Sequence, residues 1–265
     1  MDWLEALVLG IIQGLTEFLP VSSSGHLELG KALLGIQTES GLAFTVAVHG
    51  ATVLSILIVF YRDIVGLIRG LCRWEWNEEA RFLVKIGLSM LPVLLVGIFL
   101  TDAVESLFTG RVILVGGMLL VTGGLLAVAG MVPAGDKNLP YGHSLLIGLA
   151  QALAVIPGIS RSGATISTGL ILGNQRERVA RFSFLMVLLP IIGANLRDLL
   201  SGNLTAQSDI GMLPLLTGFL AALVSGLLAC RWMLYLVKKG KLLFFAFYCF
   251  AVGATALFTG ITAAG

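Results

Sequence analysis

Long apolar runs alternate with short polar segments along most of this chain. A helix needs about 20 apolar residues to cross the hydrocarbon core of a bilayer. Six runs reach that length, and the pattern therefore predicts an all-α polytopic membrane protein. The predicted transmembrane helices lie near residues 42–61, 82–101, 111–132, 180–200, 211–231 and 242–262.

Two further apolar stretches, at about 2–35 and 142–173, are interrupted near the middle by proline, glycine and serine. Neither half of either stretch is long enough to cross a bilayer comfortably. Non-helical backbone at membrane depth is tolerated where it is buried in protein. We therefore expect each stretch to form a re-entrant hairpin of two short helices.

Basic residues predict the orientation of the chain. If the six spans alternate in direction, four basic loops fall on one side of the membrane, and the other side keeps Lys31 and Arg111. By the positive-inside rule the four loops face the cytoplasm and both termini face outward. The first hairpin then enters from the outer face and the second from the cytoplasmic face. The basic residues of the four loops are Arg62, Arg69, Arg73, Arg81, Lys137, Arg176, Arg178, Arg181, Arg231, Lys238, Lys239 and Lys241.

A weak internal repeat agrees with this arrangement: residues 14–21 (GLTEFLPV) align with residues 148–155 (GLAQALAV). Three spans follow each hairpin, and an odd number of crossings turns the second half upside down. We predict one integral membrane domain over 1–265, built as an inverted-topology repeat of about 1–135 and about 140–265. In such folds the broken helices of the two halves meet near the membrane midplane, with the binding site between them.

Composition supports the membrane class and excludes others. The chain is 57% hydrophobic and 12% charged, whereas a soluble domain is about 25% charged. The net charge is only +2 and no basic face is interleaved with aromatic residues, so a nucleic-acid partner is excluded. Asp2 and Glu5 stand where a signal peptide would be positively charged, so we expect no cleaved leader.

A polar motif, QGLTEFLPVSSSGH at residues 13–26, breaks the first hairpin. Gln13 and Glu17 are four residues apart and share one face of a helix. Pro20 ends that helix, and any of the three serines that follow it could cap a second helix through His26. A charged group at membrane depth costs about 2.5–3.5 kcal/mol on insertion scales and therefore indicates a functional site.

The second hairpin is broken by PGISRSGAT, at residues 157–165. Pro157 and Gly158 end one half-helix, and Ser160 or Ser162 can cap the next. Arg161 then lies at a helix N-terminus. Both the guanidinium and the unpaired N–H groups of a helix N-terminus bind anions such as phosphate.

Together the two motifs combine phosphate-binding groups with a carboxylate and an imidazole, which can activate a nucleophile or hold a divalent ion. The substrate should be a phosphorylated molecule that reaches the site from the membrane, such as a polyisoprenoid phosphate. The pooled residues are Gln13, Glu17, Ser22, Ser23, Ser24, His26, Ser160, Arg161, Ser162 and Thr165.

Structural roles compete with these chemical ones. Glu17 and Arg161 could form an ion pair that holds the hairpins together, and Ser22 and Ser24 could serve only as helix caps. A buried histidine is often only hydrogen-bonded, which is the alternative for His26. We interpret His49, in the middle of an apolar span, as structural, with a role in lining the site left open.

The two motifs resemble the signature motifs of the bacterial undecaprenyl-diphosphatase family, also called bacitracin-resistance proteins. The resemblance covers essentially the whole chain, and both motifs are long and unusual. It implies hydrolysis of undecaprenyl diphosphate to the monophosphate and phosphate, which recycles the lipid carrier of cell-wall (peptidoglycan) synthesis in the bacterial cytoplasmic membrane. It also implies a divalent cation, Mg²⁺ or Ca²⁺. The family allows Glu or Gln at the first position of its first motif, which is Gln13 here, so Glu17 is the one carboxylate of this pair.

The resemblance implies roles for single residues. Glu17 and His26 are expected to be catalytic, and Ser23 is expected to be the nucleophile or a phosphate ligand. Our own hypothesis is that a divalent ion is held by Gln13, Glu17 and the phosphates. We hypothesise that Arg161 clamps the diphosphate and that Ser23 attacks the terminal phosphorus while His26 or Glu17 takes its proton; the rival assignment makes His26 the nucleophile or the group that activates water. The resemblance also implies Ser160, Arg161 and Thr165 as the phosphate-binding set, and the pooled motifs add Ser22, Ser24 and Ser162 as expected phosphate-binding hydroxyls.

A second class of function remains open. Inverted repeats with paired broken hairpins are also a transporter architecture, so a transporter or flippase for a phosphorylated polyprenyl lipid or small anion is the alternative. A carrier needs no nucleophile with a base, and the grouping of Ser23, Glu17 and His26 favours the enzyme. We expect membrane lipid and a polyprenyl diphosphate as partners and a site open to the outer, periplasmic face. The sequence leaves the oligomeric state undetermined, with a homodimer as one option.

Overall fold

The computed structural model describes residues 1–34, 42–108, 112–200 and 210–264, and almost all of these are helical. The elements are α1 Trp3–Phe18, α2 Ser23–Leu34, α3 Leu42–Val59, α4 Tyr61–Leu71, α5 Glu78–Phe99, α6 Thr101–Glu105, the 3₁₀ helix η2 Ser106–Phe108, α7 Val112–Met131, α8 Tyr141–Leu153, α9 Arg161–Ile171, α10 Arg176–Met186, α11 Leu188–Leu200, α13 Met212–Lys238 and α14 Leu243–Ala264.

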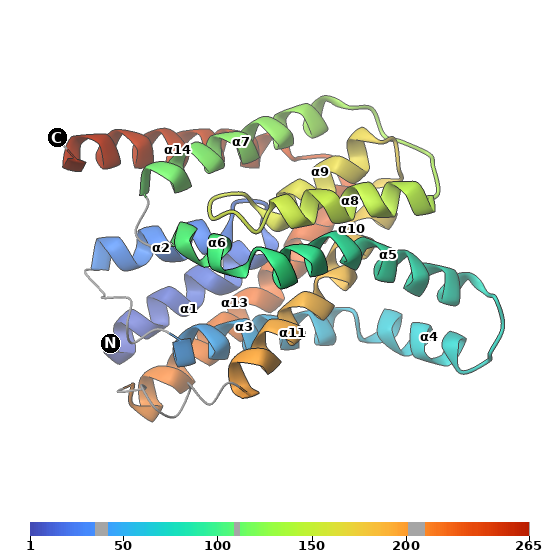
Figure 1. Ribbon diagram of the computed structural model, residues 1–265, viewed down its shortest axis with the longest axis horizontal. Helices are drawn as coiled ribbons and strands as arrows, with labels where there is room; N and C mark the ends of the chain where they lie inside the picture. Colours follow the sequence, from blue (N-terminus) through green and yellow to red (C-terminus); the bar gives the residue numbers. More distant parts are fainter. Residues whose placement is uncertain (35–41, 109–111, 201–209, 265) are drawn as a thin grey trace.

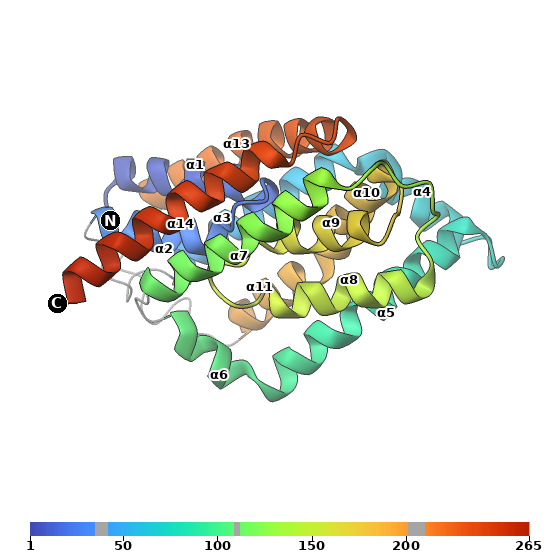
Figure 2. The same ribbon diagram turned by 90° about the horizontal axis from the view of Figure 1, so that it is seen from above.

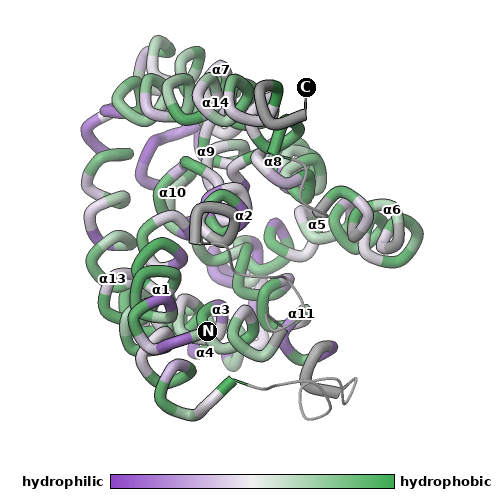
Figure 3. Tube along the Cα trace, turned by 90° about the vertical axis from the view of Figure 1, so that its left-hand side faces the viewer, coloured by the Kyte–Doolittle hydropathy of each residue, from purple (hydrophilic) through white to green (hydrophobic). Residues whose placement is uncertain are grey.

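Five helical stretches are long and apolar enough to span a membrane in the described part of the chain: α5, α7, α10 continued into α11, α13 and α14. A sixth follows if α3 and α4, which bend by 73° at their junction, are counted as one broken span. The prediction of an all-α polytopic membrane protein is confirmed. Residues along the outer helices are mainly apolar, as the green colour along α5 in Figure 3 shows, and such a surface suits lipid.

The helix boundaries differ from the prediction in two regions. The predicted loop at 62–81 contains α4, whose charged residues include Asp63 in its first turn and Arg69 in its last, where they suit the helix dipole. The span predicted to end near residue 231 continues to Lys238, because a helix does not have to end where it leaves the membrane.

Both predicted hairpins are pairs of helices separated by a break. Asp2 and Glu5 form a capping box at the start of α1. That helix ends at Phe18, directly before Leu19 and Pro20, and α2 begins at Ser23. Residues 154–160 separate α8 from α9, and Gly158 in this break has a φ of 97°, which glycine adopts without strain. We call residues 19–22 the first elbow and residues 154–160 the second elbow.

Helices of one half pack against helices of the other. α1 packs along α13, α8 packs along α5, and α7 packs along α14; the last pair runs side by side in Figures 1 and 2. Glycines permit the close approach. A Cβ added at Gly14 would lie 2.8 Å from Gly226 N, and one added at Gly148 would lie 2.7 Å from Ser89 Cα.

The four basic loops gather at one end of the molecule. Arg181 Nε lies 2.7 Å from Asp63 Oδ1, and Lys238 pairs with Glu177. The 133–142 segment joins them, because Lys137 N donates to Gly173 O. Both termini lie at the opposite end (Figure 1), as predicted. Arg111 lies outside the described residues, and so does the side chain of Lys31.

Candidate active site

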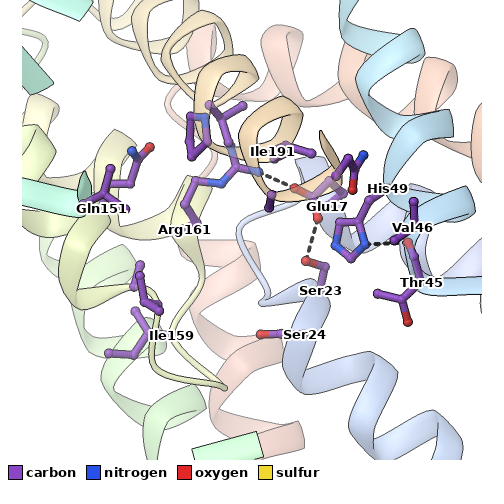
Figure 4. Close-up of a pocket in the computed structure, with 17 residues that line it drawn as sticks. Glu17, Ser23, Ser24, Thr45, Val46, His49, Gln151, Ile159, Arg161 and Ile191 are labelled. Atoms are coloured by element: carbon purple, nitrogen blue, oxygen red, sulfur yellow. Dashed lines mark hydrogen bonds and ion pairs between the residues drawn. The ribbon is translucent and has the colours of Figure 1, made fainter. Parts of the chain in front are cut away.

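The two elbows touch inside the helical bundle. Ser162 Oγ, in the first turn of α9, donates to Leu19 O of the first elbow at 3.2 Å. Arg161 Nη2 lies 2.5 Å from Glu17 Oε1, although 144 positions separate these residues in the chain. The predicted meeting of the two motifs is therefore present in the structure, and Figure 4 shows the ion pair at its centre.

A cavity of ≈ 370 Å³ lies beside this ion pair. One part of its wall is apolar and is formed by residues of α5, α11 and the second elbow, including Val93, Val155, Ile159 and Ile191. A cavity with one apolar wall and one polar wall suits a ligand with a hydrophobic body and a polar head. The polar lining consists of Glu17, Ser23, Ser24, Thr45, His49, Gln151, Arg161 and Asn195.

Glu17 is the hub of the polar lining. It is 6% exposed and lies in the last turn of α1. Its Oε2 accepts from Ser23 Oγ at 2.7 Å and from Gln13 Nε2 at 3.0 Å, while its Oε1 pairs with Arg161. A buried charge is tolerated when it is paired and hydrogen-bonded. The carboxylate also lies directly within reach of a serine proton.

Arg161 is the first residue of α9, as predicted, and its guanidinium is only partly occupied. Nη2 pairs with Glu17, whereas the buried Nη1 has no hydrogen-bond partner among the described residues. A buried donor left without a partner is costly, so this nitrogen is available to an anion in the cavity. The N-terminus of α9 adds its positive dipole end at the same point.

Four of the predicted phosphate-binding hydroxyls do not line the cavity in the described residues, namely Ser22, Ser160, Ser162 and Thr165. Ser160 Oγ caps α9 by accepting from Gly163 N, and Ser22 Oγ accepts from Gly25 N. Thr165 Oγ1 lies 2.6 Å from Ser183 Oγ. Ser24 does line the cavity. Ser22, Ser160 and Ser162 form hydrogen bonds at the elbows and the first turns of the helices that follow them, and Thr165 joins α9 to α10.

His26 does not reach the cavity lining of the described residues. Its Nδ1 donates to Ser22 O at 2.9 Å, and its Nε2 lies 2.9 Å from Tyr248 Oη. The two rings stack with their centroids 5.6 Å apart. Ser22 has a φ of 71°, which is unfavourable for a residue other than glycine, and the His26 contact braces it. The expected catalytic role of His26 stays a prediction.

Four polar residues of the cavity lining were not among the predicted site residues, namely Thr45, His49, Gln151 and Asn195. His49 of α3, interpreted as structural, points toward Glu17 and Ser23 in Figure 4, with Nδ1 donating to Thr45 O at 2.8 Å. Gln151 of α8 also lines the cavity. The repeat alignment matches Gln151 with Glu17, and this match is the signal in the sequence that could have identified Gln151 as a cavity residue.

The residues around Glu17 offer few ligands for a divalent cation. The described residues contain no cluster of three or more His, Cys, Asp or Glu side chains that could hold a metal. However, Gln13 Oε1 is buried without a hydrogen-bond partner among them, while Nε2 of the same amide donates to Glu17 Oε2 at 3.0 Å. Gln13 lies behind Glu17 and does not itself line the cavity formed by the described residues. One carboxylate and one amide oxygen fit Mg²⁺ or Ca²⁺ when substrate phosphates supply further ligands.

Comparison with known proteins gives consistent matches. The family model described as bacitracin resistance protein BacA matches residues 6–255. A protein named undecaprenyl-diphosphatase from Christiangramia forsetii is 53% identical over 260 residues, which is 97% of this chain and 98% of that protein. Proteins of the same name from Bacteroides fragilis and Bacteroides thetaiotaomicron are 51% and 49% identical, over 97% and 98% of this chain and 98% and 99% of their own lengths.

Proposed function

Because this chain belongs to the bacitracin resistance protein BacA family, we propose that it is an undecaprenyl-diphosphatase. It hydrolyses undecaprenyl diphosphate to undecaprenyl phosphate and inorganic phosphate. The observation that carries this function is the contact of Glu17 with both Arg161 and Ser23 at the wall of a cavity. A base, a nucleophile and a phosphate-binding cation are thereby combined in one place.

The proposed reaction has two steps. Ser23 Oγ attacks the terminal phosphorus, its proton passes to Glu17, and the bond from that phosphorus to the bridging oxygen breaks, so that undecaprenyl phosphate leaves. Water then attacks the phosphoserine, the Oγ–P bond breaks, and Glu17 returns the proton to Ser23. The 2.7 Å hydrogen bond from Ser23 to Glu17 supports this order. Phosphate trapped on His26 rather than Ser23 would contradict it.

Arg161 stabilises the charge of the transferring phosphoryl group. The unpartnered Nη1 and the N-terminus of α9 are the donors proposed for the phosphate oxygens. Removing one such preorganised donor typically costs a factor of about 10² to 10³ in rate. Glu17 holds the guanidinium in position through Nη2.

A divalent cation is part of the proposal. Gln13 and Glu17, together with the substrate, would hold Mg²⁺ or Ca²⁺, which would neutralise phosphate charge when bound. The unpartnered Gln13 Oε1 supports this choice.

The apolar side of the cavity is proposed to receive the first units of the polyprenyl chain. Val93, Val155 and Ile191 offer no polar partner there, and burial of apolar surface favours a lipid over a water-soluble diphosphate. Membrane lipid surrounds the remaining helices.

We propose six spans and two re-entrant hairpins arranged as an inverted repeat of about 1–135 and 140–265. The exchange of contacts between halves supports it: α1 packs on α13 as α8 packs on α5, and α7 meets α14. The contacts of the elbows are exchanged between the halves in the same way. Thr122 of α7 hydrogen-bonds Gly158 O of the second elbow, and Cys249 of α14 contacts Pro20 O of the first elbow.

The site is proposed to open to the outer face of the bacterial cytoplasmic membrane. Thr45 and His49 lie in the first half of α3, and Asn195 lies near the end of α11. These helix halves point away from the basic end of the molecule. Lipid carrier released during cell-wall synthesis would enter there, and its recycling would confer bacitracin resistance.

Phosphate release by the purified protein in detergent tests the function. Undecaprenyl or farnesyl diphosphate is supplied with and without EDTA, and we expect release that EDTA lowers. Detergent removes compartments, so turnover there cannot be transport. Absence of release from both substrates would favour the alternative, a transporter or flippase for a phosphorylated polyprenyl lipid.

A further inference from the structure

We infer that Gln151 is a second phosphate-binding residue, contributed by the second half of the repeat. The inference rests on the proposed function, because it assigns to the same cavity a ligand for the diphosphate. Gln151 is 3% exposed, belongs to α8 and lines the cavity. In Figure 4 it lies beside Arg161, on the other side of the view from Ser23 and His49.

The side-chain amide of Gln151 makes almost no hydrogen bonds with the described part of the protein. Its Oε1 has no hydrogen-bond partner among the described residues, and its Nε2 contacts only Met90 Sδ at 3.9 Å. A thioether sulfur is a weak acceptor. Buried amides are normally hydrogen-bonded, because an unpartnered one loses the bonds that water would make. An unsatisfied amide at a cavity wall therefore indicates a ligand.

The charges of the cavity indicate which ligand the amide suits. Arg161 is the guanidinium of the polar lining, and Glu17 already pairs with it. A diphosphate carries more negative charge than this pair can neutralise alone, so additional neutral donors are needed. A rotation of the Gln151 amide presents its NH₂ group to a phosphate oxygen without adding negative charge.

The internal repeat gives an independent reason. Gln151 occupies the position in GLAQALAV that Glu17 occupies in GLTEFLPV. Both residues reach the cavity from the first helix of their hairpin. The two halves thus supply a carboxylate that takes a proton and an amide that binds phosphate.

The test compares Gln151→Met and Gln151→Glu with Met90→Leu. Gln151→Met keeps the length of the side chain but removes the amide, and Gln151→Glu adds a charge that repels phosphate. Met90→Leu removes the one polar contact that the amide makes in the described part of the chain and leaves the amide itself. With farnesyl diphosphate in detergent, we expect KM to rise on the order of tenfold in both Gln151 variants. Met90→Leu should keep the wild-type KM.

A binding readout separates this inference from the proposed function. Inorganic pyrophosphate should raise the melting temperature of the wild type and of Met90→Leu, and this shift should be lost in Gln151→Met. If the wild type released no phosphate, the proposed function would be wrong, while loss of the shift would still support Gln151 as a ligand. An unchanged KM and an unchanged shift in Gln151→Met, or a Met90→Leu variant that behaves like it, would overturn the inference.

Discussion

At the scale of single residues, the guanidinium of Arg161 has two terminal nitrogens with different surroundings. Nη2 pairs with Glu17, and Nη1 is left for phosphate. The sequence alone does not predict this division, because the division depends on which atoms meet across 144 positions of the chain. Nη1, free among the described residues, also distinguishes a functional arginine from one that serves only in a structural ion pair, because a purely structural arginine would need no second donor.

Arg161→Lys tests this division. Lysine keeps the positive charge that Glu17 needs, but its compact ammonium cannot place one nitrogen at Glu17 and a second at the phosphate, as the rigid guanidinium fork does. We expect phosphate release to fall by about 10²-fold, with a melting temperature close to that of the wild type. A variant with near-normal release would show that the arginine has only a structural role.

His26 could act in either of two ways. Its Nε2 could take part in the reaction, or its Nδ1 could serve only to hold the backbone of Ser22 in place. Its Nδ1 donates to Ser22 O, where the backbone has a φ of 71°. Asparagine reproduces a donor near the Nδ1 position, and glutamine reproduces one near Nε2. If bracing dominates, His26→Asn should retain about tenfold more activity than His26→Gln. The opposite order would support direct chemistry by the imidazole.

At the scale of elements, glycine contacts set the position of the helices that carry the site. Gly14 lies one turn before Glu17 and touches α13. Its alanine variant would push α1 away from α13, and we expect a loss of about 1–3 kcal/mol of stability together with reduced phosphate release. Thermal unfolding and release are measured on the same samples.

Gly117→Ala is the matched control. A Cβ at Gly117 meets no described atom within 4 Å, so this variant should differ from the wild type by no more than about 0.5 kcal/mol. Equal effects at Gly14 and Gly117 would mean that helix propensity, and not the contact with α13, determines the result.

Apolar run lengths predicted most of the long helices, because the membrane requirement is local in sequence. Pro20 and Gly158 predicted the two breaks for the same reason. The helix α4 was missed, since an amphipathic helix beside a span resembles a charged loop in hydropathy. Side-chain partners such as that between His26 and Tyr248, 222 positions apart, are set by packing that no local pattern encodes.

At the scale of the whole molecule, the collected basic loops predict the orientation in the membrane. The chain carries its own reporter, because Cys72 is exposed at the basic end whereas Cys230 and Cys249 are buried. A membrane-impermeant maleimide should label Cys72 in inverted vesicles but not in spheroplasts. A cysteine introduced at Ser24 should be labelled in spheroplasts. The reverse pattern would contradict an outward-facing site.

The central claim is that one residue from each half builds a single diphosphate site. The most direct measurement is the rate of phosphate release by Glu17→Ala, Arg161→Ala and the double variant in detergent. We predict that each single variant loses at least about 10²-fold, and that the double variant is no slower than the slower single one, since residues acting as a unit are not additive. Independent, multiplying losses, or near-normal release by either single variant, would contradict the claim.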